Sequence, residues 1–564
     1  MEEENAVFYL KPRNEWALEI VEDPLNEHRT CRDPEKTDTL CLRIGLDGTP
    51  ENPPRLASFG RREKFDDVIL GKSCSRTGQC YFDFNAESGE LLLHDISAHQ
   101  NTQLFEAKYC VDDKGALKAV EGEPQIVSGR TGRQCAIVFG QDPDTKAERG
   151  WIFQIRKAQF FLFPPPQPTR DEDNFAKKKR DFAEMCATDA TYKVTEFASE
   201  GNQLSETATA TSLPSNGHNL RHRGQHQPRD DKLIRYMRLG PLGAGGQGKV
   251  HKVVNKYDGS HYACKTIAVR ESVPQLGINS ESEFRNFVGR EVDLVKKVQG
   301  HENIVPYLHS QGFRIDDMNI ELFMPVYDGS LQGLIQELRC QKPAIRVLQD
   351  APRDWSEAIP KDAQKMTTDM IRQISDALNY VHGMKPQIIH GDVKPGNILY
   401  RGGQFFLADF GLAKTVNTSK ERVGTPYFMA PELKEDGDRT SETDIYAFGV
   451  TIAECLFNLP TMKDRTSLKS RWRGILYGLL DKQASHYKLM LAEDPQDRPT
   501  ALECLHMHPQ QPTTTGPSTS ALPSMNLENK TRRGPDKMDW KHTWSKSISH
   551  TASSAGNSGA MGAS

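Results

Sequence analysis

Two short stretches decide the fold of this chain: His390-Gly391-Asp392-Val393-Lys394-Pro395-Gly396-Asn397 and, further along, Asp409-Phe410-Gly411. The first places a carboxylate and an amide five residues apart, and the second adds a carboxylate just after an apolar run. Asp392 is suited to accept the proton of an attacking hydroxyl group. Asn397 and Asp409 offer oxygen ligands to a Mg²⁺ ion that bridges nucleotide phosphates. The pattern therefore predicts phosphoryl transfer.

A glycine-rich segment upstream reads Gly243-Ala244-Gly245-Gly246-Gln247-Gly248-Lys249-Val250. A glycine triplet of this kind also occurs in dinucleotide-binding folds, where the third glycine opens a helix. Here the β-rich residues after the third glycine end at the turn signal Asp258-Gly259, which precedes Tyr262-Ala263-Cys264-Lys265. The order strand, turn, strand favours a loop whose backbone amides contact phosphate oxygens. The predicted phosphate-contacting positions are Gly243, Gly245, Gly248 and Val250.

An amphipathic helix is predicted after this hairpin. Its apolar residues recur at helical spacing, and Glu291 falls in the same stripe, four residues from an apolar neighbour on each side. A carboxylate on an apolar face needs a cationic partner. The alternative is that Glu291 lies exposed at the edge of the stripe. The apolar positions are Phe284, Phe287, Val288, Val292, Val295 and Val298.

Together these motifs resemble, in order and spacing, those of the eukaryotic protein kinases. The resemblance implies a two-lobed α+β fold over residues 231–508, with ATP and Mg²⁺ as cofactors. It implies that Lys265 holds the α- and β-phosphates and pairs with Glu291, that Asp392 is the catalytic base, and that Asn397 and Asp409 bind the metal.

The same resemblance points to one branch of the family. Lys394, which would steady the transferred phosphoryl group, occurs together with Thr425 in the serine/threonine kinases. Gly391 departs from the family, which usually has arginine at this position to bind a phosphate on the activation loop. We therefore expect regulation by activation-loop phosphorylation to be weakened.

Further segments fit the same fold. In the expected hinge, Met324 takes the gatekeeper position, while Pro325 and Tyr327 would recognise adenine through backbone groups, because proline keeps its carbonyl. A helix is predicted from Met370 to Val381, before the catalytic loop. Residues 424–432 match the kinase segment that ends in Ala-Pro-Glu, and residues 444–449 match a helix of the larger kinase lobe. By the same resemblance, Arg498 is expected to pair with Glu432.

Residues 6–163 read differently. Short apolar or alternating runs lie between turn residues with no convincing helix, which predicts an all-β sandwich. The predicted strands lie near residues 56–59, 67–70, 80–84, 90–94 and 151–155. Four residues fall in the order of a forkhead-associated (FHA) domain, a reader of phosphothreonine: Arg61, Ser75, Arg76 and Asn101. Guanidinium and hydroxyl donors on loops suit a phosphate dianion. The family's histidine after the serine-arginine pair and its glycine after the asparagine are absent, so a sandwich that only packs against the kinase or a partner is the alternative.

The chain of 564 residues is too long for one core. Polar composition predicts a disordered linker over residues 164–230, with a short helix near residues 182–197 as an alternative, and a disordered tail over residues 509–564. The predicted architecture is therefore multidomain: an all-β, FHA-like sandwich at 6–163, a linker, a two-lobed α+β kinase fold at 231–508, and a tail.

The net charge of −4 is close to neutral, so it gives no indication of a nucleic-acid partner. The acidic N-terminal residues and the lack of a long apolar run predict that the chain has neither a secretory signal nor a membrane span. The 11 cysteines are scattered along the chain, which favours reduced thiols over disulfides. We expect an intracellular protein, cytoplasmic or nuclear. The basic run Lys177-Lys178-Lys179-Arg180 is either a nuclear import signal or a solvated face.

The sequence as a whole resembles the checkpoint and meiotic kinases that join an FHA domain to a serine/threonine kinase. The implied function is transfer of the γ-phosphate of ATP to protein serine and threonine hydroxyls, with phosphothreonine proteins as further partners. The rival is a pseudokinase or phosphopeptide-binding scaffold. Its mark would be loss of Lys265, Asp392 or Asp409, and all three are present.

Overall fold

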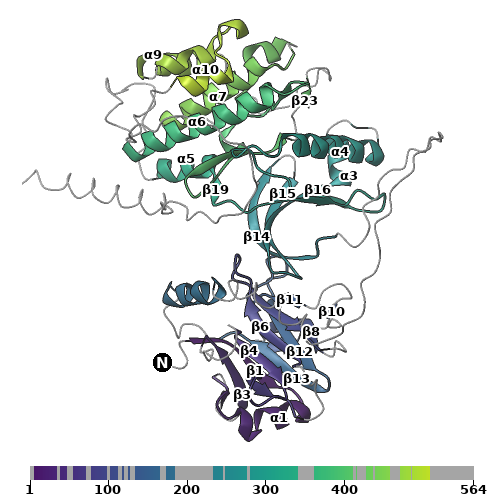
Figure 1. Ribbon diagram of the computed structural model, residues 1–564. Coiled ribbons are helices and arrows are strands. Elements are labelled where there is room, and N and C mark those ends of the chain that lie inside the picture. Colours follow the sequence, from purple (N-terminus) through teal and green to yellow (C-terminus); the bar gives the residue numbers. More distant parts are fainter. Residues whose placement is uncertain are drawn as a thin grey trace, which may run out of the picture. The chain divides into compact units, whose positions relative to one another are not determined.

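The computed structural model forms two compact units, residues 1–267 and 268–564 (Figure 1). It describes residues 5–34, 39–46, 55–71, 78–97, 102–111, 117–119, 125–126, 134–165, 173–184, 233–245, 248–275, 278, 280–340, 361–410, 414–415, 427–435, 438–457, 471–483 and 485–507. Among these residues, no helix is long and apolar enough to cross a membrane.

Two β-sheets build most of the first unit. One sheet has the order β10 (Gln125–Ile126), β8 (Thr102–Val111), β12 (Glu148–Ile155), β13 (Ala158–Phe163), β1 (Ala6–Pro12), β3 (Leu40–Gly45) and β2 (Thr30–Arg32), with β9 (Leu117–Ala119) also paired to β8. The other has the order β11 (Gln134–Ile137), β7 (Leu91–Asp95), β6 (Cys80–Phe84), β4 (Ala57–Gly60) and β5 (Val68–Ile69). Helix α1 (Glu15–Val21) and a 3₁₀ turn (Pro24–Asn26) follow β1.

Aromatic side chains join the two sheets into a sandwich. The ring of Phe8 on β1 lies 4.9 Å from that of Phe82 on β6, and Phe59 on β4 lies 5.4 Å from Phe153 on β12. All four rings are fully or nearly fully buried, so each removes a large apolar area from water. The buried indole of Trp151 donates to the carbonyl oxygen of Val138 at 2.9 Å, which satisfies its only polar group.

The strands predicted near residues 56–59, 67–70, 80–84, 90–94 and 151–155 are confirmed as β4, β5, β6, β7 and β12. The structure differs in two places. Helix α1 was not predicted, and residues 173–184, inside the predicted linker, are helical. Phe175 and Phe182 of this helix are buried in the sandwich core, where Phe182 meets Phe84 edge-on.

The basic run lies on this helix. Lys178 donates to Asn5 at 3.0 Å, and the Lys179 ammonium group lies 4.9 Å from the centre of the Phe84 ring. Two of its four cations therefore contact the sandwich.

The first unit also contains a β-meander: β14 (Tyr236–Gly245), β15 (Gly248–Asn255) and β16 (His261–Ala268), paired antiparallel. The predicted turn between β15 and β16 is confirmed, and Gly259 has φ +72°, a value that glycine adopts without strain. The glycine-rich segment lies at the opposite end of β15, between β14 and β15.

The second unit begins with α3 (Val269–Gln275) and α4 (Glu281–Val298). Ser280 caps α4 by accepting from the Glu283 amide. Four of the six apolar residues of the predicted stripe are buried, namely Phe284, Val288, Val292 and Val298, and so is Arg285, which the pattern did not include. Strands β17 (His309–Gln311) and β18 (Asn319–Met324) form a hairpin. The rest is mainly helical: α5 (Leu331–Cys340), α6 (Lys361–His382), α7 (Ser441–Leu456), α9 (Arg471–Gln483) and α10 (Ala501–His506).

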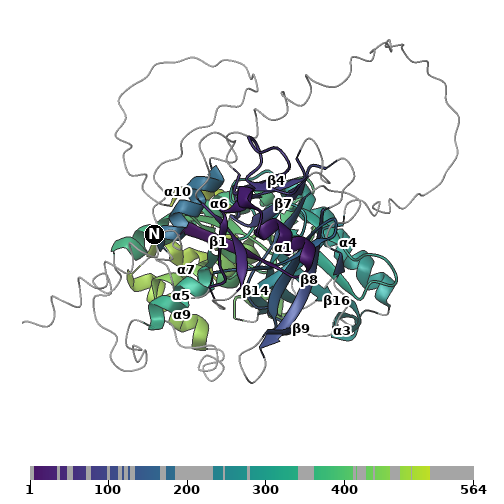
Figure 2. The ribbon, with the colours of Figure 1, turned by 90° about the horizontal axis from the view of Figure 1, so that it is seen from below.

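Helix α6 confirms the helix predicted before the catalytic loop. It packs on α7 and α10, and α7 packs on α9 (Figures 1 and 2). Short strands hold the loops that carry the chemistry: β19 (Gly329–Ser330), β20 (Ile388–Ile389), β21 (Ile398–Arg401), β22 (Gln404–Leu407) and β23 (Lys414–Thr415). Short 3₁₀ helices complete the unit at Pro395–Asn397, Pro431–Glu435, Ser485–Leu491 and Pro495–Asp497.

Candidate active site

The loop between β20 and β21 carries the predicted catalytic residues, and the structure brings three of them together. The Lys394 ammonium group lies 2.6 Å from Oδ2 of Asp392, and the Asn397 side-chain amide donates to the same oxygen at 3.0 Å. The Asn397 amide also donates to the Asp392 carbonyl at 2.9 Å. Asp392 is 8% exposed, so a buried carboxylate is held in one orientation by a cation and an amide.

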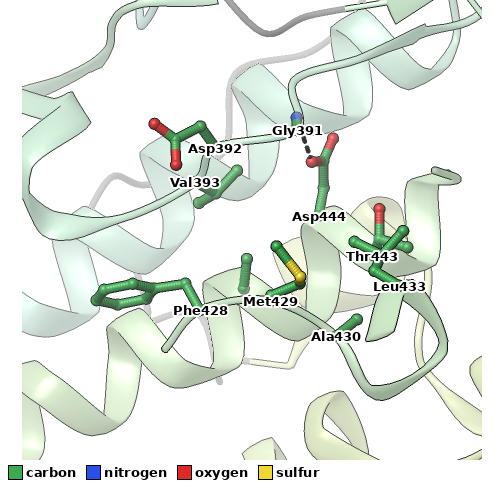
Figure 3. A pocket seen from close by; sticks show the side chains of 10 residues that line it. Gly391, Asp392, Val393, Phe428, Met429, Ala430, Leu433, Thr443 and Asp444 are labelled. Carbon is green, nitrogen blue, oxygen red and sulfur yellow. Dashed lines mark hydrogen bonds between the residues drawn. The ribbon is translucent and has the colours of Figure 1, made fainter. Parts of the chain in front are cut away.

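A second carboxylate anchors this loop from below. Asp444, at the start of α7, accepts the backbone N–H groups of His390 and Gly391, each at 2.8 Å. Figure 3 shows the bond from Gly391. The His382 ring nitrogen lies 2.9 Å from the same carboxylate. Burial alone would raise the pKa of Asp444, but the hydrogen bond and charge of His382, the charge of His390 and the Gly391 N–H outweigh it, so this pKa is lowered.

Gly391 is suited to this anchorage. Its φ is +77°, in the left-handed region that favours glycine, and its N–H points at Asp444. An arginine here, as in the related family, would be strained in this backbone conformation.

The catalytic loop is also tied to the segment that carries Asp409. The His390 ring nitrogen lies 3.0 Å from the Ala408 carbonyl oxygen, and the Ala408 N–H donates to the Asn397 carbonyl at 2.8 Å. The His390 ring stacks edge-on against Phe410 at 4.7 Å. Asp409, between Ala408 and Phe410 in the sequence, has φ +63°. This backbone conformation costs a non-glycine residue free energy, so it persists only where the surrounding contacts impose it. The backbones of the two predicted metal ligands are therefore linked.

These two side chains fit Mg²⁺ by their chemistry. The Asn397 amide nitrogen makes both hydrogen bonds to Asp392, so the amide oxygen is the atom that Asn397 would offer to a metal ion. Amide and carboxylate oxygens are the ligands that Mg²⁺ takes beside substrate phosphates. The ion would neutralise the charge that develops on the phosphoryl oxygens.

The predicted hinge residues share an apolar cluster with residues that the sequence did not single out. Met324 and Tyr327 pack against Phe406, and the Tyr327 ring lies 4.9 Å from the Phe406 ring. Burial raises the pKa of Tyr327 to about 12, so this tyrosine stays neutral. Pro325 follows directly after the end of β18. The cluster also contains Val305, Leu399 and Ala408. The sequence did not mark these three residues as part of the site, because they join it only through contacts between segments that are far apart in the chain.

The predicted phosphate-binding residues of the first unit lie on one hairpin system. Gly245 and Gly248 face each other across the β14–β15 ladder, and Val250 faces Lys265 across the β15–β16 ladder. Gly248 has φ +135°, and a Cβ there would lie 2.5 Å from the Thr266 carbonyl oxygen, so only glycine fits. Gly243 is on β14 and is exposed.

Glu291, half-buried on α4, belongs to the second unit, and its pairing with Lys265 stays a prediction. Other predicted positions lie outside the described residues: Ser75, Arg76, Asn101, Gly411 and Thr425.

A pocket opens directly beside the catalytic loop. Asp392 and Val393 form one wall, while Phe428, Met429 and Leu433 form the facing apolar wall (Figure 3). In the same unit, the buried Arg498 binds Glu432 through both guanidinium NH2 groups, at 2.6 and 2.8 Å, which confirms the pair expected from the family resemblance.

Replacing Asp444 with asparagine is expected to lower the free energy of unfolding by about 2–4 kcal/mol, because buried N–H groups and His382 lose a charged acceptor. Since the folded-state pKa of Asp444 lies below its ordinary value of 3.8, its contribution is present above that value and is lost as the pH falls through the folded-state pKa. Chemical unfolding of both proteins across this range should show the stability difference shrinking below about pH 4. A difference that stays constant into acid would contradict this assignment.

Comparison with known proteins agrees with this geometry. Residues 236–509 match the family model described as the protein kinase domain. The chain is 29% identical over 281 residues to the serine/threonine-protein kinase Nek1 of Mus musculus, covering 48% of this chain and 21% of that protein. It is 29% identical over 341 residues to the serine/threonine-protein kinase WNK8 of Arabidopsis thaliana (57% and 54%) and 30% identical over 288 residues to a Wee1-like protein kinase of the same plant (50% and 51%).

The chain thus matches between about a fifth and just over half the length of these relatives. Residues 236–509 are thus similar to the protein kinase domain, and the relatives that they match are named as protein kinases, most of them as serine/threonine kinases.

Proposed function

We propose that this protein is a serine/threonine protein kinase that transfers the γ-phosphate of ATP to hydroxyl groups of protein substrates. The observation that carries this proposal is the Asp392 carboxylate, held by Lys394 and Asn397 in a loop that also lines a small pocket. An oriented, buried carboxylate that is held by a cation and an amide suits a substrate hydroxyl as the attacking group.

The chemistry follows from these positions. Asp392 orients the substrate hydroxyl and accepts its proton as the oxygen bonds to the γ-phosphorus. The bond between that phosphorus and the β–γ bridging oxygen breaks, and ADP leaves. Lys394 lies where it would offset charge on the transferred group, and Asn397 and Asp409 would hold Mg²⁺. Rate acceleration then comes from positioning and charge neutralisation rather than a covalent intermediate.

Nucleotide binding is assigned to two sets of residues. Gly243, Gly245, Gly248 and Val250 would contact the phosphates, with Lys265 as their anchor and Glu291 as the partner of that lysine. Met324, Pro325 and Tyr327 would border the adenine ring, with the backbone of the last two forming hydrogen bonds. The apolar cluster around Met324 and Phe406 supports the second assignment, since a flat heterocycle needs such a surface.

The test is phosphorylation of a degenerate peptide library by the purified full chain with Mg²⁺ and ATP. Peptides with serine or threonine as acceptor should be labelled well above those with tyrosine, as Lys394 and the names of the relatives suggest. Labelling of tyrosine alone would overturn the acceptor class. Nucleotide binding without transfer to any peptide would favour the rival, a pseudokinase scaffold.

For the sandwich we propose phosphothreonine recognition at the end that carries Arg61. Three segments meet there. Gln79 donates to Thr102 at 3.0 Å, and the Gln79 carbonyl accepts from the Ile96 amide at 3.0 Å. Asp95 accepts from the amides of Ser97 and Thr102, at 2.8 and 3.2 Å. The chain ends that flank Ser75, Arg76 and Asn101 are thereby held near one another, which supports convergence of these side chains.

A phosphothreonine peptide is therefore expected to bind the full chain through charge-assisted hydrogen bonds, with an affinity that falls as salt is raised. Titration with a phosphothreonine library and its unphosphorylated twin measures this, and Arg61→Ala should weaken binding of the phosphorylated peptides alone. Lys157→Ala, which removes a cation that contacts Trp16, is a matched control. Equal binding of the two libraries would mean that the sandwich does not read phosphate.

A further inference from the structure

The turn between β15 and β16, residues 256–260, is bound by the N-terminal sandwich. The Ala136 N–H on edge strand β11 donates to the Lys256 carbonyl at 2.8 Å, and the Asn85 side-chain amide donates to the Asp258 carbonyl at 2.7 Å. These residues all belong to the first compact unit. Two carbonyls of the kinase domain are thus satisfied by donors from the sandwich rather than by water.

Gly259, in the middle of this turn, lies directly against β7. A Cβ there would come within 3.1 Å of Leu92 and 3.2 Å of Glu90, closer than most real contacts. The turn therefore needs glycine twice, for its positive φ and for this close approach. The second requirement would not arise in a hairpin whose turn faced solvent.

A histidine–carboxylate hydrogen bond and an ion pair flank the turn. The His261 ring nitrogen lies 2.9 Å from Glu90, and the Lys256 ammonium group lies 3.3 Å from Glu106. All four side chains are 12–22% exposed, so solvent screens these pairs less than it screens pairs on an open surface. Complementary charges at the rim of a contact fix how the two surfaces align.

Apolar residues and a buried arginine extend the contact. Met237 on β14 and Val254 on β15 are 5% and 0% exposed, and both belong to the same apolar cluster as the sandwich core. Arg149, 5% exposed on β12, donates to the carbonyl of Arg238 on β14, and Arg238 pairs with Asp144 at 3.1 Å. The contact therefore has a buried apolar centre and a charged edge, the anatomy of a specific interface.

Strands β14 and β15 run from this contact to the glycine-rich segment. Met237 and Val254 pair near one end of the ladder, and Gly245 and Gly248 pair at the other. The ladder has register shifts between Arg238 and Gly240 and between Pro241 and Gly243, and it is paired on both sides of them, so the position of one end constrains the other. Holding the β15–β16 turn therefore restricts where the glycine-rich end lies.

We propose that the sandwich is a built-in docking partner of the β15–β16 turn, and that this docking positions the glycine-rich segment for ATP. The surface formed by β7, β11 and Glu106 is thus the binding surface for the β15–β16 turn of the same chain. The effect on ATP rests on the proposed kinase function, whereas the docking does not.

Hydrogen exchange of the full chain tests the docking. Asn85→Asp keeps the oxygen that caps the Glu87 and Ser88 amides but removes the donor to Asp258, and it sets a carboxylate against that carbonyl. Exchange at Ala136 and across residues 254–261 is expected to quicken about fivefold. Unchanged exchange at both places would overturn the docking.

A charge reversal gives a second, independent arm. Lys256→Glu and Glu106→Lys should each quicken the same exchange, and the double variant should restore it to within about twofold. If the exchange rate of the double variant shows only the added effects of the two single variants, with no recovery, the contact between Lys256 and Glu106 would be contradicted. The matched control is reversal of Lys488 and Asp481, a 2.7 Å pair in the second unit, which should leave residues 254–261 unchanged.

Direct titration with ATP tests the positioning. Asn85→Asp and Lys256→Glu should weaken ATP binding about threefold, and the Lys256/Glu106 double variant should recover it. Faster exchange with unchanged ATP affinity would overturn the positioning role. If the unaltered chain binds no ATP, the proposed kinase function fails, and the exchange measurements still decide the docking.

Discussion

Asp392→Asn is expected to lower the turnover number for peptide phosphorylation by about 10²- to 10⁴-fold, the range that a positioned general base contributes. The amide has the shape of the carboxylate but cannot accept the hydroxyl proton, and it loses the ion pair with Lys394 at 2.6 Å. The measurement is steady-state phosphorylation of a serine or threonine peptide at saturating ATP.

The control for this variant is nucleotide binding. Asp392 contacts Lys394 and Asn397, whereas the predicted adenine site lies at Met324 and Tyr327, so ATP affinity should change little. Turnover like that of the unaltered protein would remove Asp392 from the chemistry. A lost melting transition would instead mean that the variant is misfolded, and Asp392→Glu, which keeps the charge, then separates the two effects.

Lys265→Met is expected to reduce phosphoryl transfer to background, because the α- and β-phosphates lose their only assigned side-chain cation. Glu291→Gln should cost less, since the lysine keeps its charge and loses only an orienting partner. Both variants, and the double variant, are measured by their turnover with the same peptide.

The double variant tests whether Lys265 and Glu291 touch. If they pair, the double variant should be little worse than Lys265→Met alone, because the glutamate acts through the lysine. Strictly additive losses would mean that they do not interact and that another residue of α4 faces Lys265. Asp293→Asn, on an exposed position of the same helix, is the matched control.

The elements that carry chemistry were predictable because their information is local. Asp392 and Asn397 are five residues apart in one loop, the Asp258–Gly259 turn is a two-residue signal, and the stripe of α4 follows the helical period. Each of these is readable within one element. The pair formed by Arg498 and Glu432 was predictable only through the family resemblance, since the two residues are far apart in sequence.

The elements that escaped prediction depend on long-range contacts. Residues 173–184 contain four consecutive cations, so their composition reads as a linker. Phe175 and Phe182, seven residues apart, nevertheless share one helix face and are buried with the sandwich core. A helix with two buried aromatic residues gains its stability from tertiary packing rather than from its own propensity.

The same reason explains what the sequence missed at the candidate site. Val305, Leu399 and Phe406 join Met324 only through the fold, and none of them carries a polar group that marks a site. Gly259 read as an ordinary turn residue, although a Cβ there would meet the sandwich. The phosphopeptide residues other than Arg61 lie outside the described residues, so their arrangement stays a prediction.

The central claim is that this chain itself transfers phosphate to serine or threonine. The most direct measurement is transfer of radiolabelled γ-phosphate from ATP to a threonine peptide, made in parallel with the unaltered full chain and Asp392→Asn, with Mg²⁺ and with a chelator. The account predicts Mg²⁺-dependent labelling at least about 10²-fold above the variant, with phosphothreonine as the product. Equal labelling by the two proteins, or none by either, would contradict it.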